Sequence, residues 1–232
     1  MAQVTEVAPL AEAQIEKAAQ VLGRAFFDDP FEVYMLPDDD SRERLSSLRF
    51  VRLLRYGHLF GKVYTTVNIP RGAAIWLPPG NWEMTEERLK QAGLFDIPSI
   101  IGSDAFQRLI SVTDYIEPYH REVPARHWYL LIVGVDRPLQ GQGLGSALLQ
   151  PILEQADAGS EPCYLETFQP KDLPFYERHG FHVLRKGVEP ASALRYWTLL
   201  RSREMTEASK YAQSAFRERV GEHGRITSTR VR

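Results

Sequence analysis

The chain is poor in cysteine and has no long hydrophobic run. Cys163 is the one cysteine among 232 residues, so an internal disulfide is excluded, and no Cys/His spacing resembles that of a zinc site. The apolar runs fall far short of a membrane span, and the N-terminus lacks the basic and apolar stretches of a secretory signal. We therefore expect a cytoplasmic protein that holds no metal ion.

Charge of either sign is not in excess. The formal net charge is −2, from 28 Lys and Arg against 30 Asp and Glu residues, which gives no reason to expect a nucleic-acid or membrane partner. Hydrophobic residues make up 44% of the chain, enough for a large core. We assign one domain to residues 1–200 and a polar C-terminal extension to 201–232, with a helix over about 202–220 and then a mobile tail.

Apolar periodicity predicts the elements of the first 120 residues. Asp28-Asp29-Pro30 predicts the end of the first helix, because the residue before a proline avoids helical geometry. Ser41 is expected to cap the start of the next helix. The expected elements are a strand at 4–10, helices at 11–26 and 41–59, an antiparallel strand pair at 62–68 and 72–77, and helices at 85–92 and 103–117.

An apolar stretch without polar alternation, residues 128–135, predicts a central strand that is covered on both faces. The helix after it has one apolar face but contains Pro151, which predicts either a kink or a helix held by packing. A short helix at 173–179 should end at Gly180. Further strands are expected at 163–168, 181–185 and 194–200.

A glycine-spaced segment joins the central strand to its helix. Its pattern Q-x-x-G-x-G at 140–145 gathers free backbone N–H groups at a helix N-terminus, which suits a phosphate group. A dinucleotide-binding loop is an alternative, since G-x-G-x-x-S at 141–146 nearly fits that motif and Glu166 lies about 20 residues further on. Residues 136–140 argue against it, because a dinucleotide loop turns at once from strand to helix. A glycine-rich turn without a ligand is the third interpretation.

A second segment, Phe175-Tyr176-Glu177-Arg178-His179-Gly180-Phe181, follows the next strand. Together, the two segments resemble the acetyl-CoA-binding core of the GNAT superfamily of N-acetyltransferases. The resemblance is best over 128–184, and within the superfamily it is strongest to the puromycin N-acetyltransferase-like group. It implies an α/β GNAT fold, a mixed and mostly antiparallel sheet flanked by helices, whose central strands at 128–135 and 162–168 splay around acetyl-CoA.

The resemblance also assigns residues to the cofactor. The strand before the loop would bind the pantetheine arm, and the loop amides would hold the pyrophosphate. Asp172 stands where family members often have asparagine, and an ionised aspartate accepts a hydrogen bond but cannot donate one, which weakens its assignment. The cofactor-binding residues implied are Val133, Gly134, Val135, Gln140, Gly141, Gln142, Gly143, Leu144, Gly145, Ser146 and Asp172.

Tyr176 is the catalytic acid that the resemblance implies. When an amine attacks a thioester, the leaving thiolate gains from a proton donor, and a phenol with a pKa of about 10 can supply one. Glu166 is the first candidate for the base that takes the amine proton, although binding a cationic substrate or pairing with an arginine would explain it equally well.

Other candidate residues for the acceptor site come from two places in the sequence. His120 and His127 flank the entry to the central strand, where a structural role is the more common one for a histidine. Asp28 and Asp29 lie where family members line the acceptor site, but helix termination alone would account for them.

The expected reaction is direct acetyl transfer from acetyl-CoA to a primary amine, because neither Cys163 nor any serine stands in a nucleophile arrangement. A small, puromycin-like amine is the first candidate acceptor, and a protein or peptide amine is the second. A non-catalytic acyl-CoA-binding regulatory module and a nicotinamide-dependent oxidoreductase are the alternatives. The expected partners are acetyl-CoA and the amine, in a monomer or homodimer.

Overall fold

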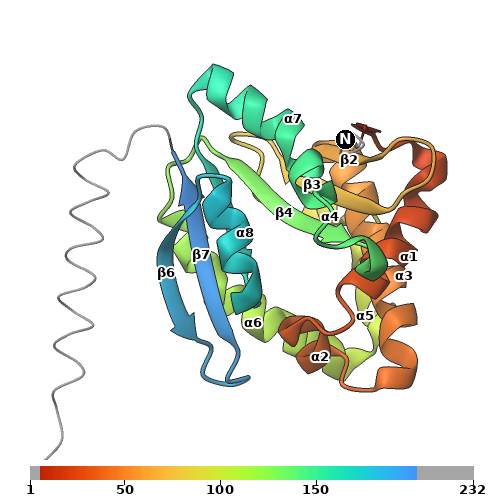
Figure 1. The fold of residues 1–232 in the computed structure, drawn as a ribbon. Coiled ribbons are helices and arrows are strands. Elements are labelled where there is room, and N and C mark those ends of the chain that lie inside the picture. The colour runs from red at the N-terminus through yellow and green to blue at the C-terminus, as the bar shows by residue number, and fades with distance from the viewer. Residues whose placement is uncertain (1–5, 203–232) are drawn as a thin grey trace, which may run out of the picture.

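The computed structural model describes residues 6–202, which form one seven-stranded sheet with helices on both faces (Figure 1). The strand order is β1-β2-β3-β4-β5-β7-β6. The strands are β1 (Val7–Pro9), β2 (Lys62–Thr66), β3 (Gly72–Leu77), β4 (Trp128–Val135), β5 (Cys163–Thr167), β6 (His182–Val188) and β7 (Arg195–Arg201). The helices are α1 (Ile15–Ala25), α2 (Pro30–Met35), α3 (Asp39–Phe60), α4 (Glu86–Gln91), α5 (Ile97–Ile101), α6 (Ser103–Arg121), α7 (Leu144–Gly159) and α8 (Leu173–Arg178).

One parallel strand pair interrupts an otherwise antiparallel sheet. Within residues 6–202, β4 and β5 pair at two positions alone, Trp128 with Cys163 and Tyr129 with Tyr164. From there β4 continues along β3, and β5 continues along β7. The two central strands therefore diverge. This confirms the predicted α/β fold with a mixed, mostly antiparallel sheet and splayed central strands.

A β-bulge marks the point where β4 turns away from β5. Ile75 and Trp76 of β3 pair with Ile132 and Leu130, so Leu131 has no residue opposite it. An extra residue bends its strand and increases the local twist. Leu131 and Ile132 both pack against the cluster under α1 and α3 as a result. The bulge lies just past the last β4–β5 pair, so the bend begins where the parallel pairing stops.

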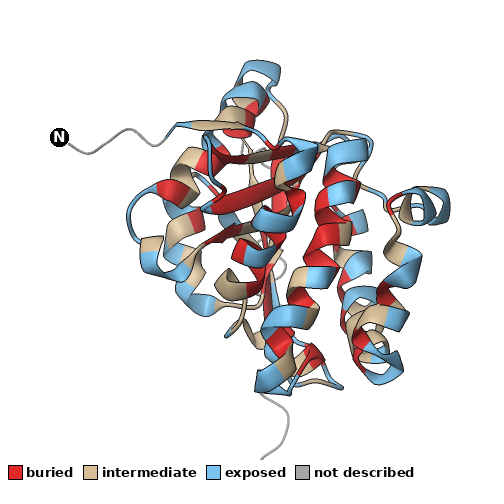
Figure 2. Ribbon diagram, turned by 90° about the vertical axis from the view of Figure 1, so that its right-hand side faces the viewer, coloured by how far each residue is buried: buried red, intermediate tan, exposed pale blue. Residues whose placement is uncertain are grey.

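Hydrophobic clusters lie on both faces of the sheet, and buried residues are found on its strands and on the helices around it (Figure 2). On one face, Leu22 of α1 and Leu54 of α3 pack on alternate residues of β2 and β3. On the other face, Leu148 of α7 and Tyr176 of α8 pack on β3, β4 and β5. β3 is buried along its whole length because helices cover both of its faces. Helix α6 covers β5 and β7 from the α3 side, through contacts such as the stacked rings of His120 and Tyr164.

Helix α7 is unbroken through Pro151. Leu148 and Ile152, on either side of this proline, are fully buried between the helix and the sheet. Burial of two such side chains contributes about 2 kcal/mol each, which offsets the roughly 3 kcal/mol cost of an interior proline. Of the two outcomes expected for this helix, the structure therefore has the one held by packing.

Helix α2 is an element that the sequence interpretation lacked. Asp29 begins this helix rather than ending the previous one: its carboxylate accepts hydrogen bonds from the Phe31 and Glu32 amides, at 2.9 and 3.4 Å. Pro30 is the first helical residue, a position where its missing N–H costs nothing. Helix α1 already ends at Ala25. The first helix does end before Asp28-Asp29-Pro30, as predicted, but the helix that begins at these residues was not predicted.

Other boundaries shift by a few residues. Helix α3 begins at Asp39 with Asp38 as its N-cap, and the Ser41 hydroxyl donates to the Asp38 carboxylate at 2.5 Å instead of capping the helix. Helix α6 continues through Pro118 to Arg121, and β6 continues to Val188. Helix α5 was not expected. The helix predicted over 202–220 and the first residues of the strand predicted at 4–10 lie outside the described residues.

Candidate active site

The loop between β4 and α7 has the backbone geometry of an anion site. Gly141 and Gly143 have φ angles of +74° and +86°, which L-residues with a side chain rarely adopt. A Cβ atom built on either glycine would meet no other atom within 4 Å. The loop surface in front of these two glycines is therefore open, and the backbone can be approached closely there.

The amides of this loop have no hydrogen-bond partner within residues 6–202. Among the described residues, the backbone N–H groups of 141–146 make no hydrogen bond, and the next amide, that of Ala147, donates to Gly143 as the helix begins. The first amides of a helix carry a partial positive charge from the helix dipole. A run of free amides in front of open space is an arrangement that binds phosphate.

The two loop glutamines hold the loop itself. The Gln140 side chain donates to the Val135 carbonyl at 3.0 Å, and the Gln142 side chain donates to the Pro138 carbonyl at 3.1 Å. Both amide groups are thereby used within the loop. We conclude that the glutamine of the Q-x-x-G-x-G pattern ties the loop to the end of β4 and leaves the backbone to face a ligand.

Ion pairs attach the start of the loop to α1. Arg24 donates to both carboxylate oxygens of Asp136, at 3.0 and 2.6 Å, and the Arg137 side chain donates to the Arg24 carbonyl at 2.9 Å. Arg137 also pairs with Asp28 at 2.5 Å. The Asp28 side chain is 67% exposed. Asp28 therefore helps to anchor the loop at the surface, a contact that its sequence position did not predict.

The edge of β4 that faces away from β3 is open beyond Tyr129. The parallel partner β5 has diverged there, so residues 130–135 pair with β3 alone among the described strands. Half of the backbone N–H and C=O groups of Val133, Gly134 and Val135 consequently point toward the gap between β4 and β5. Gly134 is needed for packing, because a Cβ atom there would lie 2.8 Å from Leu22 of α1 and 2.8 Å from Phe26, the residue after this helix.

Tyr176 lies on the α7 side of the sheet, next to the glycine loop. Its neighbour Phe175 is 3.2 Å from where a Cβ of Gly145 would be, so α8 packs directly on the start of α7. Tyr176 is 7% exposed. Burial raises the pKa of its phenol, and the carboxylates of Asp172 and Asp29 raise the pKa further. The phenol therefore stays protonated at neutral pH.

Asp29 and Asp172 are brought near Tyr176 from distant parts of the sequence. Burial raises the pKa of Asp29 to about 6, and burial also raises the pKa of Asp172. Asp29 is held as the N-cap of α2, which packs on α6 and α3 (Figure 1). Asp172 precedes α8. The region around Tyr176 is thus acidic.

Glu166 lies on the opposite face of β5 from Tyr176. Its side chain is 14% exposed, and the Tyr129 hydroxyl donates to its Oε2 at 2.7 Å. Burial raises the pKa of this carboxyl to about 7, against the Tyr129 hydrogen bond, which lowers it. No Lys or Arg of residues 6–202 forms an ion pair with it. A role in pairing with an arginine is therefore not supported.

His120 and His127 adjoin Glu166. His120 Nδ1 lies 3.5 Å from Glu166 Oε1, and the Nε2 atoms of the two histidines are 2.8 Å apart. His127 Nδ1 is 2.6 Å from the Pro124 carbonyl oxygen. Trp82 stacks on His120 with ring centroids 4.1 Å apart and covers the pair. These contacts join residues from α6, the turn before β4 and β5. Sequence reasoning noted each histidine separately, but the role of Trp82 and Tyr129 was missed.

Cys163 takes no part in a nucleophile arrangement. It is fully buried, and burial raises the pKa of its thiol to about 12. Within residues 6–202 no group of three or more His, Cys, Asp or Glu side chains is arranged to hold a metal ion. The same part of the chain contains no helix that is long and apolar enough to cross a membrane.

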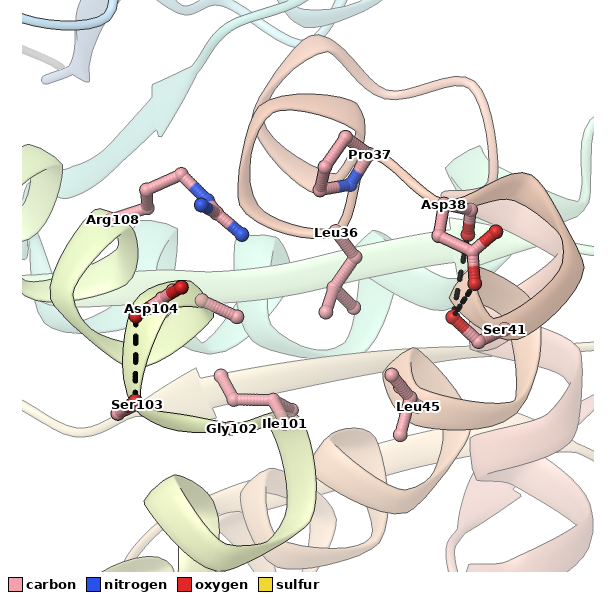
Figure 3. Close-up of a pocket in the computed structure, with 11 residues that line it drawn as sticks. Leu36, Pro37, Asp38, Ser41, Leu45, Ile101, Gly102, Ser103, Asp104 and Arg108 are labelled. Atoms are coloured by element: carbon pink, nitrogen blue, oxygen red, sulfur yellow. Dashed lines mark hydrogen bonds between the residues drawn. The ribbon is translucent and has the colours of Figure 1, made fainter.

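A cavity of about 360 Å³ lies apart from these residues, between the C-terminal end of α2, α3, α5 and the start of α6 (Figure 3). Arg108 at its edge donates to the Met35 carbonyl, and Asp38 accepts from Ser41. None of the predicted site residues lines it. We assign it no part in the chemistry below.

Comparison with known proteins agrees with this geometry. Residues 107–183 match the family model described as acetyltransferase (GNAT) domain, and this range includes the glycine loop, Glu166 and Tyr176. An uncharacterised N-acetyltransferase of Schizosaccharomyces pombe is 28% identical over 173 residues, which cover 72% of this chain and 70% of that protein.

Solved structures with the same fold extend over most of the chain. One, described as histone acetyltransferase HPA2 and related acetyltransferase from Corynebacterium glutamicum, has a TM-score of 0.60 at 23% identity and covers 88% of this chain and 99% of its own. Arylalkylamine N-acetyltransferase 2 from Aedes aegypti has a TM-score of 0.59 at 12% identity, with coverage of 87% and 100%. At these identities the likeness shows the fold.

Proposed function

Because the chain carries a GNAT acetyltransferase domain and is an acyltransferase, we propose that it transfers an acetyl group from acetyl-CoA to a primary amine by direct attack. The observation that carries this proposal is the run of amides at 141–146 that have no partner in the described part of the chain and lie beside the point where β4 and β5 separate. A diphosphate and an extended acyl arm need these two features next to each other.

The loop and the open strand edge fit acetyl-CoA. The amides of 141–146 would hold the pyrophosphate, since the positive φ of Gly141 and Gly143 leaves no side chain in front of them. The open edge of β4 at 133–135 would hydrogen-bond the pantetheine arm. Asp172 would adjoin the acyl end from its position before α8. When bound, acetyl-CoA supplies the thioester that the amine attacks.

Glu166 and Tyr176 would handle the two protons of the reaction from opposite faces of the sheet. The ionised Glu166 carboxylate accepts a proton from the substrate ammonium, and the neutral amine then forms the N–C bond. The C–S bond breaks, and the Tyr176 hydroxyl donates its proton to the leaving sulfur. The nitrogen loses its second proton to the Tyr176 phenolate, which restores the phenol, and the proton on Glu166 passes to solvent. A backbone amide of 133–135 would stabilise the negative charge on the carbonyl oxygen.

The acceptor would approach from the side of α2 and α6. Asp29 and Asp172 make that region acidic, which favours a cationic amine. We propose a small-molecule amine, with puromycin-like aminonucleosides among the candidates, and a peptide amine as the second class. We also propose a cytoplasmic enzyme that acts as a monomer or homodimer without nucleic acid or membrane, with its acetyltransferase domain in residues 1–200.

Release of free thiol from acetyl-CoA tests this function. The full chain is incubated with acetyl-CoA and a panel of puromycin, polyamines and short peptides, and acetyl-CoA binding is measured in parallel. Turnover with one class of amine identifies the acceptor. Binding without turnover on any amine would favour a regulatory module. Absence of acetyl-CoA binding would contradict the assignment of 141–146, and binding of NAD in its place would support the oxidoreductase.

Changing Gly143 to alanine should weaken acetyl-CoA binding about tenfold. A residue with a side chain at a φ of +86° is strained by roughly 1–2 kcal/mol, and its Cβ would project into the open space where the pyrophosphate is proposed to bind. Isothermal titration calorimetry with acetyl-CoA measures the change. Gly80→Ala is the matched control, because Gly80 also has a positive φ, +79°, and no neighbour within 4 Å, but lies after β3. Equal binding by both variants would contradict the prediction.

Changing Tyr176 to phenylalanine should lower kcat by about tenfold or more while leaving acetyl-CoA affinity unchanged. The ring stays in its packed position on α8, and only the proton donor is lost. Steady-state rates with the best acceptor and a binding titration give the two numbers. Tyr56→Phe, at a fully buried tyrosine of α3, is the control and should keep full activity. Unchanged turnover in the Tyr176 variant would remove this residue from the mechanism.

A further inference from the structure

A chain of three buried side chains connects Glu166 to a backbone carbonyl. It runs from Glu166 Oε1 to His120 Nδ1 (3.5 Å), from His120 Nε2 to His127 Nε2 (2.8 Å), and from His127 Nδ1 to the Pro124 oxygen (2.6 Å). His120 is 4% exposed and His127 is fully buried. The reaction proposed above uses the first member of this chain and gives the two histidines no role.

The carbonyl at one end decides which nitrogen of His127 carries a proton. A carbonyl oxygen only accepts hydrogen bonds, so a contact of 2.6 Å requires a proton on His127 Nδ1. Burial lowers the pKa of His127, and burial lowers the pKa of His120 to about 3, so both rings are neutral at neutral pH. A neutral ring that is protonated at Nδ1 has a lone pair at Nε2. His127 therefore accepts at Nε2.

The tautomer of His120 follows from the tautomer of His127. The two Nε2 atoms share one hydrogen bond, and because His127 accepts, His120 must donate its Nε2 proton. The Nδ1 atom of His120 is left with a lone pair, and it is this lone pair that faces Glu166 Oε1. An ionised carboxylate would meet another acceptor there. A protonated carboxyl has a proton to direct at this lone pair, and a modest shortening of the 3.5 Å separation would make it a hydrogen bond.

The charged and titratable groups around the chain do not change this conclusion. Tyr129 of β4 donates to the other oxygen of Glu166, and Tyr164 of β5 stacks on His120. Both tyrosine hydroxyls lower the pKa of Glu166, but burial outweighs them. Arg121 of α6 opposes a proton on His120, and its guanidinium is already paired with Glu83 and Glu117. No acidic group of the described residues other than Glu166 forms an ion pair with either histidine.

We propose that the Pro124 carbonyl, acting through His127 and His120, holds a proton on Glu166 near neutral pH, so that these histidines are positioning residues for the proposed base. This inference rests on the proposed function. Burial alone raises the pKa of Glu166 to about 7. The histidine chain gives a second reason for the acid limb of the activity to lie near pH 7 rather than near the ordinary value of 4.5. Glu166 can accept a proton from the substrate ammonium only after it has lost the proton that it already holds.

Changing His127 to phenylalanine tests the proposal. The substitution keeps a ring in the buried space and removes the group that forces His120 to donate from Nε2. His120 is then free to carry its proton on Nδ1 and to donate it to the Glu166 carboxylate. We expect the acid limb of kcat/KM to move to lower pH by about one unit. His182→Phe, at an exposed histidine of β6, should leave the limb in place.

The tautomers are measured independently of activity, and on the wild-type protein. Two-bond ¹H–¹⁵N spectra of the histidine-labelled chain should give a neutral His127 protonated at Nδ1 and a neutral His120 protonated at Nε2, with assignments from His120→Phe and His127→Phe. A His120 protonated at Nδ1 would overturn the proposal. An acid limb that stays in place in His127→Phe while activity falls equally at every pH would also overturn it.

Failure of the proposed function gives a different pattern. If Glu166→Gln keeps both the activity and the acid limb of the wild-type protein, then Glu166 is not the base, and the proposal about its proton falls with it even where the tautomers agree. If Glu166→Gln loses the activity and the tautomers are reversed, the base is correct and the positioning role of the two histidines is wrong.

Discussion

Changing Glu166 to glutamine is expected to lower kcat/KM for acetyl transfer by roughly 100-fold, because the variant has no group that can accept the proton of the substrate ammonium. Glutamine has the shape of a protonated glutamate. Its carbonyl oxygen can accept from the Tyr129 hydroxyl, and its amide N–H can donate to His120 Nδ1. The fold should therefore be retained, and the loss should be in the chemistry.

The raised pKa of Glu166 predicts the direction in which kcat/KM and the free energy of unfolding change with pH. The base acts when ionised, so kcat/KM of the wild-type protein should rise tenfold per pH unit up to about pH 7, where the pKa of Glu166 lies, and level off above it. The same carboxyl has a raised pKa in the folded state, so the folded chain holds a proton that the unfolded chain has lost between pH 4.5 and 7. The free energy of unfolding therefore falls as the pH rises through this window. In the glutamine variant the pH dependence of kcat/KM should vanish, and the fall in the free energy of unfolding should become shallower, because Asp29, with a pKa raised to about 6, still contributes to it.

Thiol-release rates from pH 5 to 9, with urea unfolding at the same pH values, test these statements. Glu154→Gln is the matched control, since Glu154 is an exposed residue of α7 with a hydrogen bond to Gln150. The control should behave as the wild-type protein. An acid limb that persists in Glu166→Gln would mean that another group titrates, and the assignment of the base would have to be abandoned.

Changing Glu32 to alanine is expected to destabilise the fold by about 3–5 kcal/mol, because it leaves the Arg49 guanidinium buried without its partner. Glu32 of α2 is 2% exposed, pairs with Arg49 of α3, and accepts from the Ser46 hydroxyl at 2.5 Å. Arg49 is 6% exposed, and its Nε atom has no hydrogen-bond partner among the described residues. Burial already lowers the pKa of Arg49 to about 10.

Thermal unfolding measures this loss, and a drop in Tm of roughly 6–20 °C corresponds to it for a domain of this size. The double variant Glu32→Leu with Arg49→Met removes both charges, and we expect it to recover most of the stability. Arg126→Ala, at an exposed ion pair with Glu161, should change Tm little. A Glu32 variant as stable as the Arg126 variant would show that the buried pair does not hold α2 on α3.

Loss of the Glu32–Arg49 pair would also affect the candidate active site. Helix α2 presents Asp29 at its N-terminus, and Asp29 is one of the carboxylates that raise the pKa of Tyr176. Glu32 is in the first turn of the same helix. The position of the acidic group near Tyr176 therefore depends on a salt bridge buried beneath it.

The elements that sequence reasoning found are those with strong local signals. The strand at 128–135 and the pair at 62–68 and 72–77 have continuous or alternating apolar residues, and these patterns do not depend on distant parts of the chain. Asp29-Pro30 is a local signal of another kind, a cap followed by a helix-starting proline, and it was interpreted as a helix end. The bulge at Leu131 leaves no mark in the sequence, because it arises from pairing with β3.

The candidate site was predictable in its parts and not in its assembly. The glycine loop is local, so its positive φ angles and free amides follow from the order of residues at 140–146. The contact between His120 and Glu166 joins α6 to β5 and depends on the packing of both. Similarly, Asp28 was considered for the acceptor site, but its pairing with Arg137 requires α1 to lie against the loop.

Because β4 and β5 pair over so short a length, the stability of the sheet should depend on the concentration of the acetyl donor. Two residue pairs join the half of the sheet formed by β1 to β4 to the half formed by β5 to β7. An acyl arm held in the gap would contact both halves where a longer strand ladder would otherwise bridge them. A ligand that binds only the folded chain adds RT ln(1 + [L]/Kd) to its stability. The protein would thus be most resistant to unfolding when the acetyl donor is abundant and most exposed to proteolysis when it is scarce.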